Sequence, residues 1–134
     1  MANTFGDLSA VRDYTPPVRT QTPLQTGPYT GTVTPAQREV LKNELGRAIA
    51  LMDKPESFLM IRFQDNYDLY FSGNRLEKGA YVSIAMLGEP DREKNAAMTA
   101  RVTEILQKQL DIPPKCVYVS YRGVRDWGWR GKLL

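Results

Sequence analysis

Two stretches of the chain repeat the same order of features, and this repeat constrains the fold more than any other feature. In each stretch a helix-like segment is followed by a proline, Pro55 or Pro114, and three residues later by the first core residue of a strand, Phe58 or Val117. Both helix-like segments carry apolar residues at helical spacing, which predicts one buried face on each. The repeat therefore predicts an α+β fold, with two pseudo-repeated β-α-β units forming a four-stranded sheet and two helices on one face.

Local signals predict where the helices begin. Thr34 can cap the first helix, Pro35 suits its first position, and Gln37 completes a capping box; this helix is expected to run to about Met52. The second helix is expected to open at Pro90, with acidic residues in its first turn. Strands are predicted at residues 58–63, 80–87 and 117–121.

The helices would bury only one face of such a sheet, and the other face must also be shielded from water. No remaining segment of the chain is large enough to cover it, so an apolar sheet face would stay exposed in a monomer. Residues 1–28 hold four prolines, many Thr and Gln and few large apolar side chains, which predicts an irregular N-terminal extension ahead of a domain at 29–134. The uncovered face therefore indicates self-association.

Composition excludes several kinds of chemistry. The 134 residues suit one domain, and the 18 basic and 15 acidic residues are spread along the chain, so no uniformly basic face for nucleic acid is implied. The chain has no histidine and one cysteine, Cys116, which excludes disulfide frameworks, Cys/His zinc sites and His-based catalytic triads. We expect no metal and no cofactor.

The first residues, MANTFGDLSAVRDY, have neither a basic region nor an apolar core of a signal peptide, and no apolar run approaches the length of a membrane span. The default expectation is a cytoplasmic protein that does not bind a membrane.

Five stretches taken together resemble the macrophage migration inhibitory factor family of the tautomerase superfamily. They are KPESFLMIRF, YFSGN, AYVSIAMLG, DIPPKCVYVSY and the closing WGW, and they follow one another in order between about residues 32 and 131. The resemblance implies a homotrimer in which three sheets form a barrel with the helices outside. It also implies release without a signal peptide as an alternative to a cytoplasmic location.

The same resemblance implies active sites between neighbouring subunits, where an amino-terminal proline moves a proton in the keto-enol tautomerisation of phenylpyruvate-like 2-keto acids. Lys54 matches the lysine that holds the substrate carboxylate and lowers the pKa of the proline. The other substrate-binding positions of the family fall on Leu87, Tyr118, Ser120 and Trp129. Leu87 takes part through its backbone amide, and Ser120 replaces the usual asparagine with a shorter hydrogen-bonding group.

The amino terminus differs from the family pattern. The counterpart of the catalytic proline is Pro23, within an uncertainty of about two residues in the register. Pro23 follows Thr22, so its nitrogen is an amide without a basic lone pair, and it can act as a base only if the chain is cleaved before it. Arg130-Gly131-Lys132 also follows the WGW motif where the family commonly has Asn-Gly and a small residue.

Each of these residues also has a simpler interpretation. Lys54 is then a solvated surface lysine, Tyr118 a core aromatic, Pro23 a loop proline and Cys116 a packed thiol. Basic residues interleaved with Tyr121, Trp127 and Trp129 could stack on nucleic acid, although a solvated tail with structural tryptophans is the preferred interpretation. Two hypotheses follow for the whole chain: a trimeric tautomerase, or a non-catalytic trimeric binding protein whose extension has displaced the catalytic proline.

Overall fold

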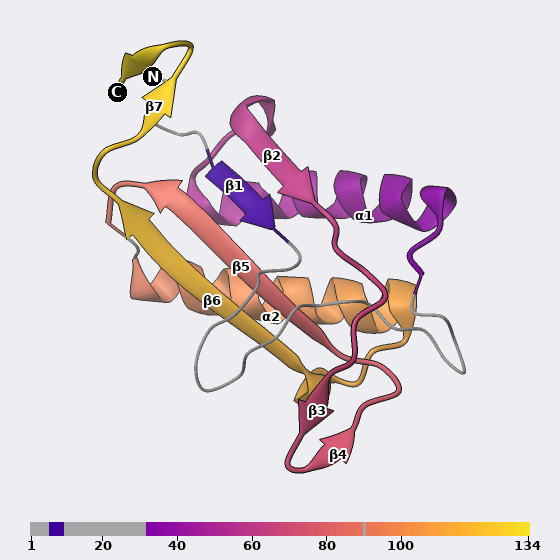
Figure 1. Cartoon of the computed structure of the whole chain (residues 1–134). Helices are drawn as coiled ribbons and strands as arrows, with labels where there is room; N and C mark the ends of the chain where they lie inside the picture. The colour runs from indigo at the N-terminus through magenta and orange to yellow at the C-terminus, as the bar shows by residue number, and fades with distance from the viewer. Residues whose placement is uncertain (1–5, 10–31, 90) are drawn as a thin grey trace.

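The computed structural model describes residues 6–9, 32–89 and 91–134. Its central sheet has four strands in the order β2-β1-β5-β6 (Figure 1). β1 (Gly6–Ser9) runs parallel to β2 (Leu59–Arg62) and antiparallel to β5 (Ala80–Leu87), and β5 runs parallel to β6 (Val117–Val124). Each half of the sheet thus consists of two parallel strands, and the two halves meet at the antiparallel pair β1 and β5.

The helices α1 (Pro35–Ala48) and α2 (Arg92–Leu110) both lie on one face of this sheet (Figure 1). Each of them follows the first strand of its half and precedes the second, as a β-α-β crossover requires. The expectation of a small α+β fold is therefore confirmed. None of the helices in the part of the chain that the structure describes is long and apolar enough to cross a membrane.

The caps of the helices follow from local sequence. Gln37 N donates to Thr34 Oγ1 at 3.1 Å, and Thr34 N donates to Gln37 Oε1 at 2.9 Å, which is the predicted capping box. The start of the second helix differs from the prediction: Asp91 is the N-cap of α2 and accepts from Glu93 N and Lys94 N, and the first helical residue is Arg92. Pro90, where we expected the helix to open, lies outside the described residues.

The core lies between the helices and the sheet. Strand β5 contributes four alternate side chains to it, and these are almost fully buried because residues two apart share one face of a strand. The helices contribute residues at helical spacing, and each large one stabilises the fold by roughly 1.5–3 kcal/mol through burial. The principal core side chains are Leu41, Leu45, Ile49, Met52, Val82, Ile84, Met86, Met98, Val102, Ile105, Leu106 and Leu110.

The repeat is present, but its register is one residue away from the prediction. The first helix continues as the 3-10 helix η2 (Ile49–Met52), which is capped by Asp53, and α2 is capped by Asp111. The backbone of both aspartates is in the left-handed region, with φ of 59°. From there Pro55 corresponds to Pro113, and the 3-10 helices η3 (Glu56–Phe58) and η4 (Pro114–Cys116) correspond to each other. The strands then begin at Leu59 and Val117, so Phe58 precedes its strand.

Two short hairpins flank the sheet at opposite ends (Figure 1). β3 (Tyr70–Phe71) and β4 (Asn74–Arg75) lie near the start of β5 and β6, and β7 (Gly128–Trp129) and β8 (Lys132–Leu133) follow the end of β6. Side chains on the sheet face away from the helices include exposed Met60 and Tyr118.

The extension differs from the expectation at one place. We expected residues 1–28 to be irregular, but Gly6–Ser9 form a strand between β2 and β5. Val33 lies just before α1, where it is 1% exposed and belongs to no strand. The strand that completes the first β-α-β unit therefore comes from the expected extension.

Candidate functional site

Lys54 lies at an unusual position in the repeat. It directly follows the left-handed Asp53, and the matching residue in the second half, after Asp111, is the fully buried Ile112. The partly buried Lys54 side chain reaches the end of β5, where Nζ donates a hydrogen bond to the carbonyl oxygen of Leu87 at 3.2 Å. The fold thus places an ammonium group at a position that suits an apolar side chain.

The surroundings of Lys54 lower its pKa. Burial is the largest cause, because it penalises the charged form, and the positive charge of Lys94 adds to it, while the carboxylate of Asp53 acts in the opposite direction. Asp53 is itself paired with Lys94, with 2.5 Å between Oδ2 and Nζ. Among the described residues no carboxylate forms an ion pair with Lys54, so its remaining N–H groups can bind an anionic ligand.

An aromatic pair lies close to Lys54 in the sequence. Phe58, in η3, packs edge-to-face against Trp129 of β7, with 5.2 Å between ring centroids and 88° between ring planes. The guanidinium of Arg130 lies 5.4 Å from the centroid of the Trp129 ring. The sequence predicted Trp129 as a substrate-binding residue but did not predict that Phe58 packs against it. The only sequence feature that could have indicated Phe58 is its position four residues after Lys54.

Tyr118 and Ser120 lie elsewhere. On β6, Tyr118 is opposite Tyr81 of β5, whereas Leu87 is opposite Val124. The six residue-to-residue steps from Tyr118 to Val124 span about 20 Å at ~3.3 Å per step, so within one chain Tyr118 cannot reach a ligand held by Lys54. The structure therefore brings Lys54 and Leu87 together but places Tyr118 and Ser120 apart from them.

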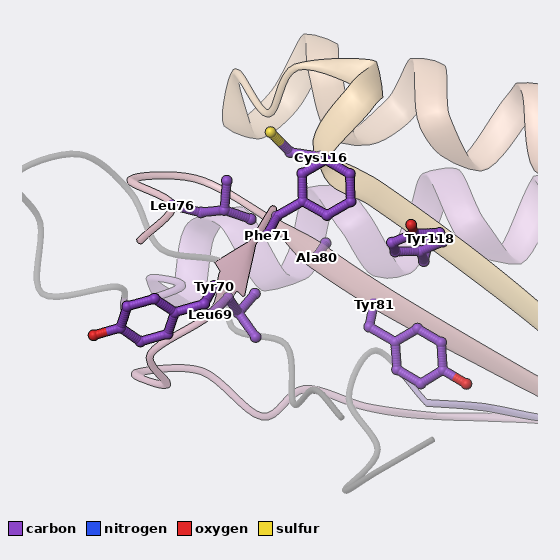
Figure 2. A pocket seen from close by; sticks show the side chains of 8 residues that line it. All are labelled: Leu69, Tyr70, Phe71, Leu76, Ala80, Tyr81, Cys116 and Tyr118. Carbon is purple, nitrogen blue, oxygen red and sulfur yellow. The ribbon is translucent and has the colours of Figure 1, made fainter. Parts of the chain in front are cut away.

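Tyr118 and Ser120 have partners at their own end of the sheet. Tyr118 is 45% exposed and packs edge-to-face against Phe71, with ring centroids 6.0 Å apart. Ser120 Oγ lies 2.6 Å from Tyr81 Oη. Figure 2 shows the small apolar pocket beside this cluster, with room for about one water molecule at ≈ 20 Å³. Its lining is Leu69, Tyr70, Phe71, Leu76, Ala80, Tyr81, Cys116 and Tyr118.

The start of β1 lies next to the Lys54 contact. Gly6 is opposite Leu59 of β2 and opposite Met86 of β5, one residue before Leu87. Pro23, the predicted catalytic residue, lies outside the described residues. The described part of the chain also contains no group of three or more His, Cys, Asp or Glu side chains that could hold a metal ion.

Two β-α-β units with both helices on one face of a mixed sheet, and a lysine at the end of β5, are the arrangement expected from the resemblance to the tautomerase superfamily. Residues 32–134 match the family model of macrophage migration inhibitory factor (MIF). The chain belongs to the macrophage migration inhibitory factor family.

Individual relatives agree with this assignment. Macrophage migration inhibitory factor of Xenopus laevis is 26% identical over 99 residues, which cover 72% of this chain and 85% of that protein. The crystal structure of Leishmania major MIF2 has a TM-score of 0.79 at 24% identity and covers 97% of both chains. A fused 4-OT protein described as a symmetric trimer has a TM-score of 0.68 at 17% identity and covers 96% of this chain and 94% of that chain.

Proposed function

We propose that the protein is a homotrimeric tautomerase that interconverts the keto and enol forms of phenylpyruvate-like aromatic 2-keto acids. The single observation that carries this proposal is the contact between Lys54 Nζ and the Leu87 carbonyl at 3.2 Å. This contact holds the Lys54 ammonium at the end of β5, and no carboxylate among the described residues forms an ion pair with it. There the ammonium would bind the substrate carboxylate by a charge-assisted hydrogen bond.

Assembly supplies the second half of this site. Lys54 and Tyr118 belong to opposite ends of one subunit, so a pocket containing both needs Tyr118 and Ser120 from a neighbouring subunit. The exposed sheet face with Met60 and Tyr118 supports burial in such an assembly. The trimeric 4-OT relative has the same fold, which supports a closed ring of three subunits with their sheets forming a barrel.

The proton transfer needs a base that the intact chain does not provide at Pro23. Cleavage after Thr22 would convert its amide into a secondary amine, which can accept a proton. It would also remove β1 (Gly6–Ser9), so this form of the proposal requires a segment after Pro23 to take the place of β1 between β2 and β5. The ammonium of Lys54 would lower the pKa of that amine by like-charge repulsion and keep a larger fraction unprotonated at neutral pH. In this proposal Pro23 is the base, and Lys54, the Leu87 backbone, Tyr118, Ser120 and Trp129 bind the substrate.

A non-catalytic trimeric binding protein is the second candidate. The start of β1 favours it. Gly6 begins the strand that lies beside the Lys54 contact, where a tautomerase needs its proline base, and the chain has no proline before Pro16. In this form the anion site and the assembly are kept and no base is present. We propose a cytoplasmic location for either form.

Two measurements on the natural protein separate the candidates. Intact mass gives the first residue of the mature chain, and ultraviolet absorbance follows enol-phenylpyruvate. A chain that begins at Pro23 and accelerates the keto-enol reaction supports the enzyme. A chain that begins at Met1 or Ala2 and leaves the reaction at its buffer rate eliminates the enzyme and supports the binding protein.

A further inference from the structure

The turn between β7 and β8 contains an arginine where the backbone disfavours it. Arg130 and Gly131 are its two central residues, and both have positive φ, 55° and 79°. Such a two-residue hairpin turn prefers Asn, Asp or Gly at its first central position, because the Cβ of other residues crowds the backbone in the left-handed region. The observed arginine therefore calls for a functional reason.

The Arg130 side chain lies against the ring of Trp129, one member of the Phe58–Trp129 aromatic pair. Its guanidinium lies 5.4 Å from the centre of the Trp129 ring, and Trp129 contacts Phe58, which is four residues after Lys54. Within residues 32–89 and 91–134, neither Arg130 nor Lys132 forms an ion pair with a carboxylate. Both line an open hollow of about 410 Å³, together with Trp129 and Leu134.

We propose that Arg130 determines substrate specificity by binding a second anionic group, so that the preferred ligands are aromatic 2-keto acids with a carboxylate at the far end of the ring. This inference rests on the proposed function. Lys54 binds the carboxylate next to the keto group, the Phe58–Trp129 pair contacts the ring, and Arg130 binds the far carboxylate. A guanidinium suits that role because it stays charged and can donate two parallel hydrogen bonds to a carboxylate.

The experiment is isothermal titration calorimetry of the full chain with two probes, phenylpyruvate and (4-carboxyphenyl)pyruvate, so that no catalytic amine is needed. We expect the dicarboxylate probe to bind roughly five- to tenfold more tightly, as one partly exposed charge-assisted contact predicts. In Arg130→Asn the two probes should bind within about twofold of each other. Asn is favoured at this turn position, so this variant should keep its melting temperature.

The matched control is Arg125→Asn, because the Arg125 side chain is 95% exposed and its nearest carboxylate partner is the neighbouring Asp126, at 3.9 Å. This variant should retain the full preference for the dicarboxylate. Equal affinities of the two probes for the unmodified protein would overturn the inference and leave the proposed function standing. If neither probe binds, the proposed anion site fails and this inference fails with it.

Discussion

Lys54 donates to the Leu87 carbonyl at 3.2 Å from a position that the second repeat fills with Ile112, which is 0% exposed. The two halves therefore share one backbone path, in which an aspartate with left-handed φ is followed by one residue and then by a proline. They differ in the middle residue, which is Lys54 in the first half and Ile112 in the second. An isoleucine contributes to the core there, whereas a lysine contributes a partly buried charge. This difference separates a structural position from a candidate functional one.

Replacing Lys54 by isoleucine should separate stability from binding. We expect Lys54→Ile to raise the free energy of unfolding by about 1 kcal/mol, because an apolar side chain replaces a partly buried ammonium. The same change should weaken the binding of phenylpyruvate by at least roughly tenfold, because it removes the hydrogen bond from a charged group. Urea denaturation and calorimetry measure the two quantities; a loss of both stability and binding would contradict the assignment of Lys54 to a site.

Removing the charge without filling the space tests the same residue in another way. Lys54→Ala should weaken phenylpyruvate binding by roughly ten- to a hundredfold, because a hydrogen bond to a charged group contributes about 1.5–3 kcal/mol. Lys42→Ala is the matched control, since Lys42 is an exposed lysine paired with Glu39 on α1. Equal binding by the two variants would remove Lys54 from the site.

The lowered pKa of Lys54 predicts a dependence of binding and stability on alkaline pH. Carboxylate binding needs the charged form, so it should be lost as pH rises through the folded-state pKa, which lies below the ordinary 10.5. Between these two pKa values the unfolded chain binds more protons than the folded one, so this group makes stability rise with pH in that window. Calorimetric titrations from pH 7 to pH 11 should show the loss in the native chain, with the binding midpoint below 10.5. A midpoint at or above 10.5 would contradict the burial of the ammonium.

The elements that sequence predicted well are those set by neighbouring residues. The Thr34 and Gln37 capping box is confirmed because both partners lie within one helical turn. The repeat register was wrong by one residue because Pro113 and Pro114 are adjacent, and only the left-handed Asp111 shows which one matches Pro55.

Other features depend on contacts that no local pattern contains. Gly6–Ser9 include Gly, Asp and Ser, which are weak strand formers, so this strand is defined by its pairing with β2 and β5. The Phe58–Trp129 contact joins residues far apart in the chain, and the opposite placement of Lys54 and Tyr118 follows from the strand register. None of these relationships could be predicted from spacing.

A site shared between subunits makes a quantitative prediction for mixed assemblies. Lys54→Ala and Tyr118→Ala should each weaken phenylpyruvate binding alone, because each removes one side of every site. Equal amounts of the two variants can be unfolded together and refolded. In a random closed ring, the subunit that supplies Lys54 is intact at half of the interfaces, and its neighbour keeps Tyr118 at half of those, so about a quarter of the sites are complete. Calorimetry should then show tight binding with a stoichiometry of about one quarter of the native value. Sedimentation of the refolded mixture should give three times the 15.2 kDa chain mass. Mixtures that bind no better than either variant alone would show that the two residues do not share a site.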